Sequence, residues 1–380
     1  MESRNKKKEI EIGLNMMKIC FVGNSDSIHL QRWSRWFVQR GHDVHLITTG
    51  STKINEVTTY FLKKTKGPIN YLFRIIKTIR IIRRIKPQII NAHFVSGTES
   101  FAAALSGFHP FMVSVWGSDI ARDPDRSCVF KIIVRYVLKH ADIVHTGDEF
   151  GKDRVRQLGC DESKIIIQPL GVDLELFNSC IPLEKINKFV VLSANPWFPY
   201  RHIDILIKSI PEVIKQIKNI TFIFIGGGHL EEELRNLSTK LGVSNHIVFV
   251  GRILHTEMCN YLINADILVD TYIVGDNAGG GIGVTNMEAM SCGIPLLLAE
   301  RGYLKKIGKS LRDEPWYCSL VYDAGNPKDL AEKIIQLMKD QELRKKIGAK
   351  EKKIAREIGD WNKNMGQIER LMLDMIKNKS

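Results

Sequence analysis

The stretch GDNAGGGIGVTNMEAMSCG occupies residues 275–293, between the apolar runs ADILVD (residues 265–270) and IPLLLA (residues 294–299). An apolar run, a glycine-rich loop, a short helical segment and a second apolar run predict a strand–loop–helix–strand unit. A helix N-terminus presents free backbone N–H groups and partial positive charge, so this unit predicts an anion-binding site. The glycines stand directly before the expected helix, at Gly275, Gly279, Gly280, Gly281 and Gly283.

Glu288 lies five residues after Gly283, inside the expected helix. A carboxylate there can accept two hydrogen bonds from a vicinal diol such as that of a ribose. Backbone amides for a phosphate and a carboxylate for a ribose together predict a nucleotide site. The alternative interpretation is a glycine-rich surface loop without a ligand. The flanking strands and Glu288 favour the nucleotide site.

The second half of the chain alternates apolar runs with helical segments, which is typical of a parallel, doubly wound sheet. Ligands of such sheets bind outside the carboxyl ends of the strands. Asn195 and Arg201 follow the first strand of this half. The position of Arg201 fits either a contact with a diphosphate or a basic side chain that is solvated and has no ligand. Gly226 opens a triple glycine after the second strand, which fits either a close approach of backbone to ligand or a plain β-turn. The expected strands are residues 189–193, 221–225, 246–250 and 267–270.

The first half of the chain shows the same alternation and predicts a second sheet of the same kind. Gly23, His93 and the run Trp116–Asp119 each follow an expected strand. We therefore expect them to line one cleft. The loop at residues 24–27 lacks GxGxxG, so a dinucleotide fingerprint is absent there. The expected strands are residues 18–23, 44–48, 88–92, 111–115, 142–145 and 164–167.

The 380 residues are enough for two domains. We predict a charged extension over residues 1–16, a first Rossmann-like domain over 17–180 and a second over 181–358. Residues 169–188 lack periodicity and are predicted to be a linker. A last helix, within residues 359–380, is expected to pack back on the first domain.

The net charge of +13 favours an anionic partner, which can be a nucleic acid, a membrane surface or a phosphorylated substrate. The helix expected over residues 71–86 interleaves basic and apolar side chains, which is typical of a helix on an anionic membrane. The alternative is a core-facing helix with a solvated basic face. The candidate acceptor or membrane face consists of Arg74, Lys77, Arg80 and Arg84.

The charged start of the chain does not resemble a signal peptide, and no apolar run is long enough to cross a bilayer. We therefore expect a cytoplasmic protein, with peripheral attachment to the inner face of the plasma membrane as a further hypothesis. Nucleic acid is not expected as a partner, because no basic stripe with interleaved stacking aromatics is present.

Three stretches in this order resemble the family 4 (group 1) glycosyltransferases of the GT-B fold. They are residues 17–48, which open MKICFVGNSDSIHLQRW, residues 165–177, IIIQPLGVDLELF, and residues 281–299, GIGVTNMEAMSCGIPLLLA. The resemblance implies two Rossmann-like domains that face each other across a cleft. It also implies a retaining, metal-independent transfer of a sugar from a nucleotide-diphosphate donor to a glycan or lipid-linked glycan. A UDP-sugar is the expected donor, and no cofactor is expected.

The resemblance also implies roles for residues of the second domain. Glu288 matches the glutamate that holds the donor ribose. The backbone of Gly283, Val284 and Thr285 would face the diphosphate or the sugar, and Arg252 lies near the turn that contacts the nucleobase. Gly226 and Asn195 complete the expected donor site of this domain.

Four positions concern catalysis or depart from the family pattern. Gly280 stands where the family has the first glutamate of its E-x7-E motif, and Asn195 and Arg201 stand where it has an Arg and Lys pair. Trp116 replaces an acceptor-domain histidine. Arg201 would stabilise the leaving diphosphate.

In the first domain, Asp119 matches the aspartate of the family's GSD motif. Asp119 and His93 would position the substrates rather than abstract a proton, and Gly23 would lie against the donor. Two other function classes stay open. One is a GT-B nucleotide-sugar 2-epimerase, and the other is a basic binding module without catalysis.

Overall fold

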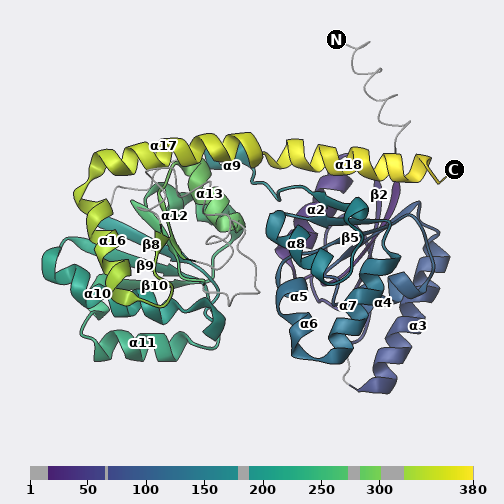
Figure 1. Ribbon diagram of the computed structural model, residues 1–380, viewed down its shortest axis with the longest axis horizontal. Helices are drawn as coiled ribbons and strands as arrows, with labels where there is room; N and C mark the ends of the chain where they lie inside the picture. Colours follow the sequence, from purple (N-terminus) through teal and green to yellow (C-terminus); the bar gives the residue numbers. More distant parts are fainter. Residues whose placement is uncertain (1–15, 65–66, 179–187, 273–282, 301–320, 380) are drawn as a thin grey trace, which may run out of the picture. The chain divides into compact units, whose positions relative to one another are not determined.

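The computed structural model describes residues 16–64, 67–178, 188–272, 283–300 and 321–379 (Figure 1). The chain divides into two compact units, each an α/β layer structure. Unit 1 contains the described residues up to Pro169 and those from Lys363 onward, and unit 2 runs from Leu170 to Asn362. Within the described ranges, no helix has both the length and the apolarity needed to cross a bilayer.

Unit 1 is built on a seven-stranded sheet in the order β3-β2-β1-β4-β5-β6-β7, in which every pair is parallel. The first strand shows that the sheet is interior, since four of its five residues are buried and only Lys18 is partly exposed. The strands are β1 (Lys18–Val22), β2 (Asp43–Thr48), β3 (Thr58–Phe61), β4 (Ile89–His93), β5 (Phe111–Ser114), β6 (Ile143–Thr146) and β7 (Ile165–Ile167).

Helices cover both faces of this sheet. Val22 and Val113 point to a core that also contains residues of α3, α4 and α7. Phe21, the neighbour of Val22, points the other way and contacts Phe37 of α2 at 5.7 Å between ring centroids. The helices are α2 (Ile28–Gln39), α3 (Pro68–Ile85), α4 (Thr98–Leu105), α5 (Ser118–Ala121), α6 (Asp123–Arg126), α7 (Cys128–His140), α8 (Glu149–Gln157) and α18 (Trp361–Lys377), with a 3-10 turn at Glu162–Lys164.

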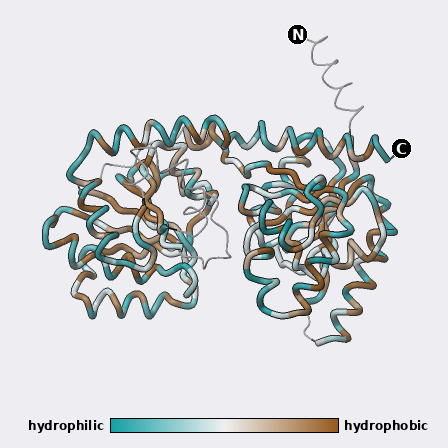
Figure 2. The backbone as a smooth tube through the Cα atoms, in the orientation of Figure 1, coloured by the Kyte–Doolittle hydropathy of each residue, from teal (hydrophilic) through white to brown (hydrophobic). Residues whose placement is uncertain are grey.

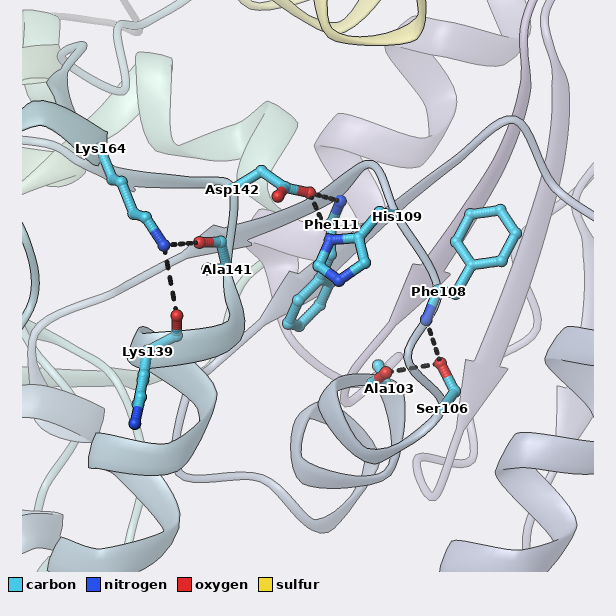
Figure 3. A network of polar contacts seen from close by, with 9 residues as sticks. All are labelled: Ala103, Ser106, Phe108, His109, Phe111, Lys139, Ala141, Asp142 and Lys164. Atoms are coloured by element: carbon cyan, nitrogen blue, oxygen red, sulfur yellow. Dashed lines mark hydrogen bonds and ion pairs between the residues drawn. The ribbon is translucent and has the colours of Figure 1, made fainter. Parts of the chain in front are cut away.

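A polar network fixes the amino ends of β5, β6 and β7 (Figure 3). The carboxylate of Asp142 accepts hydrogen bonds from His109 Nδ1 at 2.8 Å and from the Phe111 backbone N–H at 2.7 Å. Lys164 donates to the carbonyl oxygens of Lys139 and Ala141, at 3.2 and 2.9 Å. The ammonium thereby satisfies carbonyl groups at the C-terminal end of α7 that have no partner within the helix. These contacts lie at the sheet edge opposite the one that carries the candidate site.

Unit 2 has a six-stranded sheet in the order β10-β9-β8-β11-β12-β13, again with parallel pairs only. Figure 2 shows apolar residues concentrated along the strands inside each unit. The strands are β8 (Phe189–Ala194), β9 (Ile220–Ile225), β10 (Ile247–Gly251), β11 (Ile267–Asp270), β12 (Leu296–Ala299) and β13 (Val321–Tyr322).

Alternation along β8 separates two cores in unit 2. Val191 packs in a cluster with residues of α10, α11 and α16. Val190 and Leu192 pack in another cluster with residues of α9, α12 and α13. The helices are α9 (Leu174–Asn178), α10 (Ile203–Gln216), α11 (Glu231–Lys240), α12 (Met258–Ile263), α13 (Val284–Cys292), α16 (Pro327–Lys339) and α17 (Gln341–Ile358), with 3-10 turns at Pro199–Arg201, Ser244–His246 and His255–Glu257.

Short polar side chains mark the starts of several helices. Ser127 accepts from the backbone N–H of Phe130 at the start of α7, and Asp148 accepts from Gly151 in α8. Asn326 and Asp340 cap α16 and α17 in the same way. Such caps satisfy N–H groups that a helix leaves free at its first turn.

The division between the units falls earlier than residue 180, the predicted end of the first domain. Val172 forms a bridge with Asp360, and Val172 and Phe177 pack in a core cluster of unit 2. The predicted linker therefore contains α9, which belongs to unit 2. The sequence also missed β3, because this edge strand is half exposed and lacks an apolar run.

The last helix packs on unit 1, as expected. Lys363 and the residues after it belong to that unit. Asn364 of α18 donates to the carbonyl oxygen of Pro169 at 3.0 Å. Glu369 is held by Arg40 and His42, which lie between α2 and β2.

Candidate functional site

Helix α13 begins at the carboxyl edge of the unit 2 sheet. Gly283 is its N-cap residue with an extended backbone, and Val284 and Thr285 form the first turn. The side chain of Asn286 donates to the carboxylate of Asp270, the last residue of β11, at 2.8 Å. This bond fixes the first turn of the helix at the end of a central strand. The rest of the predicted glycine loop, including Gly280, lies outside the described residues.

Glu288 lies in the second turn of α13 and is 1% exposed. Its Oε1 accepts a hydrogen bond from Nε2 of His255 at 2.6 Å. His255 opens the 3-10 turn that follows β10. The carboxylate that the sequence predicts as the ribose ligand is thus already paired with an imidazole from the turn after β10.

Arg201 lies after β8, where the sequence predicts a cation for a diphosphate. Its guanidinium stands over the ring of Tyr272, 4.2 Å from the ring centroid. Its Nη1 donates to the side-chain oxygen of Asn195 at 3.4 Å, and its carbonyl oxygen accepts from the hydroxyl of Thr271 at 2.7 Å. These contacts hold the backbone and the guanidinium of Arg201 against the end of β11.

Gly226 and Arg252 lie at the ends of β9 and β10. A Cβ at Gly226 would overlap the carbonyl oxygen of Asn195, and its φ of +148° is one that other residues rarely adopt. A Cβ at Gly227 would stand 3.0 Å from Cγ and Nε of Arg252, so that side chain passes directly over the glycine turn. The glycines let the loops after β8, β9 and β10 approach one another closely.

The structure therefore brings the predicted residues of unit 2 to one sheet edge. The end of β11 connects them, because Thr271 and Tyr272 hold Arg201 while Asp270 holds α13. An arginine and a helix N-terminus at one edge can bind a diphosphate, and a carboxylate in the next turn can bind a diol.

In unit 1, Asp119 is buried at the carboxyl end of β5. One carboxylate oxygen accepts from the backbone N–H of Val95 and the other from that of Trp116, both at 2.9 Å. Burial raises the pKa of Asp119 to about 6, against the lowering effect of these hydrogen bonds. The carboxylate thus fixes the loops after β4 and β5 to each other.

His93 ends β4 and lies inside a group of rings. Its imidazole is stacked on Trp116 with centroids 5.2 Å apart, and Trp116 is also stacked on His29 with centroids 4.4 Å apart. A Cβ at Gly23 would stand 3.0 Å from the carbonyl oxygen of His93, and the φ of Gly23 is +155°. The structure therefore brings together the predicted residues of unit 1.

The histidines of this group are neutral at pH 7. Burial lowers the pKa of His93 well below its usual range, with smaller contributions from His145 and His29. Burial also lowers the pKa values of His145 and His29 to about 4. Both ring nitrogens of His93 lack a hydrogen-bond partner among the described residues. His93 and His145 are fully buried, so these rings form an uncharged cluster beneath the loops after β4 and β5.

The predicted basic face lies on α3. Lys77, Arg80 and Arg84 are exposed, whereas Arg74 is half buried and stacks over Tyr71 at 4.4 Å. The first half of the helix exposes large apolar side chains instead of burying them, and these are Ile69, Leu72, Phe73 and Ile76. The interpretation of α3 as a core-facing helix is therefore wrong for the first half of the helix, whose large apolar side chains face solvent.

Two residues of the unit 2 edge were missed from the sequence. His255 stands 33 positions before Glu288, and no motif connects the two. Tyr272 follows an apolar strand, but a single tyrosine at a strand end carries no specific signal. Its position two residues after Asp270, the last residue of β11, could have indicated that it lies at the carboxyl edge.

Two parallel-sheet α/β units, each with its candidate residues at the carboxyl ends of the strands, define the GT-B class of protein. The similarity to solved structures agrees with this class. The Anabaena protein HepE in complex with UDP-glucose has a TM-score of 0.76 at 19% identity, with 94% of this chain and 99% of that chain covered.

Residues 18–147 match the family model described as glycosyl transferase 4-like, and residues 181–354 match that of glycosyl transferases group 1. The chain belongs to this glycosyltransferase family. An uncharacterized glycosyltransferase of Methanocaldococcus jannaschii is 26% identical over 86% of this chain and 89% of its own length. A GDP-mannose-dependent monoacylated alpha-(1-6)-phosphatidylinositol monomannoside mannosyltransferase of Corynebacterium glutamicum is 29% identical over 48% of this chain and 49% of its own length.

Proposed function

We propose that this glycosyltransferase is a retaining, metal-independent enzyme that takes its sugar from a nucleoside-diphosphate donor bound to unit 2. One observation carries the proposal. Glu288 is buried in the second turn of α13, and the first turn of that helix is tied to the end of β11 by the Asn286–Asp270 hydrogen bond. This arrangement places a carboxylate that can accept hydrogen bonds from a ribose diol one turn from the helix N-terminus that can bind an anion.

The leaving diphosphate would gain negative charge as the donor bond breaks. Backbone N–H groups at the start of α13, including those of Val284 and Thr285, can stabilise this charge. Arg201 adds a fixed positive charge, because its guanidinium is already oriented against Tyr272. Arg252, over the glycine turn, would lie beside the nucleobase.

The transfer breaks the bond between C1 of the sugar and the diphosphate oxygen. It forms a bond between C1 and the acceptor oxygen on the same face of the sugar. The acceptor proton passes to an oxygen of the leaving diphosphate, so no protein base is required. His93 and Asp119 of unit 1 are buried, so they would position the acceptor or the sugar through the loops that they hold.

The donor is a UDP-sugar or a GDP-sugar. A UDP-sugar is the first expectation from the sequence, and a GDP-mannose-dependent relative adds the second. Both nucleotides present the same diphosphate and ribose to Arg201, α13 and Glu288. The contacts with the base therefore decide between them.

Calorimetric titration with UDP and GDP tests the donor site. Glu288→Gln keeps the size and the oxygen facing His255 but removes the charge, and we expect it to weaken nucleotide binding about tenfold or more. Glu233→Ala, at an exposed position on α11, is the control and should bind as the wild type. Unchanged affinity in Glu288→Gln would refute the site.

Product analysis tests the reaction. A labelled sugar nucleotide with a glycan acceptor should give a glycoside of unchanged anomeric configuration, and EDTA should not reduce the rate. An isomerised sugar nucleotide in the absence of acceptor would instead identify a 2-epimerase.

We further propose that the acceptor is a lipid-linked glycan and that α3 docks on an anionic membrane surface. Exposed apolar side chains, among them Ile69 and Phe73 at 70% and 65% exposure, precede the basic residues Lys77, Arg80 and Arg84 on the same helix. An apolar segment next to a cationic one is suited to the boundary between acyl chains and anionic headgroups.

A further inference from the structure

The shortest contact of the Glu288 carboxylate is its hydrogen bond with His255. Nε2 of His255 lies 2.6 Å from Oε1 of Glu288, and the glutamate is 1% exposed. An ionised carboxylate has only acceptor oxygens, so Nε2 of the imidazole carries the proton. Among the described residues, His255 is the one hydrogen-bond donor to this carboxylate.

The backbone around His255 holds the imidazole in place. The preceding residue, Leu254, donates its backbone N–H to the carboxylate of Glu257 at 2.8 Å, which closes the turn after β10. On the other side, the imidazole meets the ring of Phe177 edge-on, with centroids 6.0 Å apart. The side chain is about one third exposed, so it borders the same open edge as the donor site.

We propose that His255 is a positioning residue that orients Glu288 and thereby makes the donor site selective for ribose over 2′-deoxyribose. This inference rests on the proposed function of Glu288 as the ribose ligand. The bond from His255 fixes the rotation of the carboxylate through Oε1. The second oxygen is then held ready for the diol, without a loss of side-chain freedom on binding.

A hydrogen-bond donor at residue 255 must occupy the position of Nε2 to reach Oε1 of Glu288. This requirement gives a matched pair of variants. The amide nitrogen of glutamine in His255→Gln reaches the place of Nε2. The amide nitrogen of asparagine in His255→Asn reaches only the place of Nδ1. Both variants keep a polar, uncharged side chain at a partly exposed position, so they differ in reach rather than in character. His246→Asn is the control, because His246 lies before β10, at the opposite end of that strand.

The experiment measures the affinities of UDP and 2′-deoxy-UDP, and of GDP and 2′-deoxy-GDP, by calorimetry on the full chain. We expect the wild type to prefer the ribonucleotide about tenfold or more, as the loss of a hydrogen bond to a charged group predicts. His255→Gln and His246→Asn should keep that preference. His255→Asn should reduce it to about twofold, mainly by weakening the ribonucleotide, because the deoxynucleotide gains less from an oriented carboxylate.

A full preference in His255→Asn would overturn the inference, as would an equal loss of affinity for both sugars, which indicates a structural role alone. A loss of preference in His255→Gln equal to that in His255→Asn would also overturn it, since reach would then be irrelevant. The proposed function fails separately, and is refuted if wild-type protein binds none of the four nucleotides or shows no preference for ribose.

Discussion

Nε2 of His42 and Oε1 of Glu369 lie 2.7 Å apart, which ties the last helix of the chain to the first βα unit. Nδ1 of the same imidazole accepts the backbone N–H of Met17 at 3.1 Å, so Nε2 is the nitrogen that donates to the carboxylate. Arg40 adds a second hydrogen bond to Oε1 at 2.9 Å. The start of β1, the turn after α2 and the helix α18 are therefore joined through two side chains.

Glu369→Ala should loosen α18 from unit 1. The change removes the acceptor for two donors, one of them an arginine, and we expect a loss of about 2 kcal/mol in the free energy of unfolding. Urea unfolding measures this loss. Asp374→Ala removes an exposed carboxylate from the same helix and should leave the midpoint unchanged. An equal effect of both variants would show that the anchoring contact contributes nothing.

The same contact has a defined pH dependence. Hydrogen bonds from Arg40 and His42 lower the pKa of Glu369 despite the opposing effect of partial burial. A lowered folded-state pKa gives stability that is present above the ordinary glutamate pKa and is lost as pH falls through the folded value. The difference between wild type and Glu369→Ala should therefore shrink in acid.

Glu351→Gln should stabilise unit 2. Burial raises the pKa of Glu351 well above its usual range, and a long hydrogen bond of 3.4 Å from the Leu296 backbone N–H opposes this only weakly. With a raised pKa, the native state keeps the Glu351 proton, so wild-type stability falls as pH rises above the ordinary glutamate pKa of 4.5. Glutamine has no such loss. The gain should be about 1–2 kcal/mol at pH 8 and smaller at pH 5.

Thermal unfolding at the two pH values measures the effect. Glu357→Gln, at an exposed position on the same helix, is the control and should shift little at either pH. A gain at Glu351 that does not grow with pH would contradict the assignment of a buried, protonated carboxyl group.

Most of the architecture was predictable because most strands are apolar runs that are followed by glycine or a polar residue. The expected strand at residues 267–270 is β11, and the helix expected within residues 359–380 is α18. The failures have a local cause. Residues 58–61 form an edge strand with exposed side chains, and residues 174–178 form a helix that is stabilised by packing against unit 2 rather than by its own periodicity.

The site was predictable only where a residue belongs to a motif or follows a strand. Glu288 and Arg201 meet that condition, and the structure places both at one sheet edge. His255 and Tyr272 act through contacts between separate elements. One amino-acid sequence does not reveal which residues of separate elements meet. The pairing of His255 with Glu288 depends on the register of β10 against β9, which brings the turn after β10 over α13.

Arg201→Lys should reduce kcat strongly and change nucleotide affinity less. A lysine keeps the charge but loses the planar group that stacks on Tyr272 and can bind two phosphate oxygens, so we expect a loss of about a hundredfold in kcat. Tyr272→Leu should lower kcat by a smaller factor, because it removes the ring that orients the Arg201 guanidinium. Arg235 of α11 is a comparable arginine that stacks over Phe249 of β10, and Arg235→Lys should leave the rate unchanged. Wild-type kcat in Arg201→Lys would remove Arg201 from the reaction.

Helix α3 should attach the protein to anionic vesicles through two separable contributions. Replacing Lys77, Arg80 and Arg84 by glutamine should lower vesicle affinity about a hundredfold, because each basic residue near the surface contributes about 1 kcal/mol. Replacing Leu72 and Phe73 by serine should weaken binding by a loss that salt does not alter, since their exposed side chains would enter the acyl boundary. Co-sedimentation with anionic and zwitterionic vesicles measures both effects. Replacing Lys353 and Arg356, which are exposed on α17, by glutamine is the control for the loss of charge. Equal partitioning of wild type between the two vesicle types would refute the membrane assignment and leave the basic face of α3 as a solvated surface.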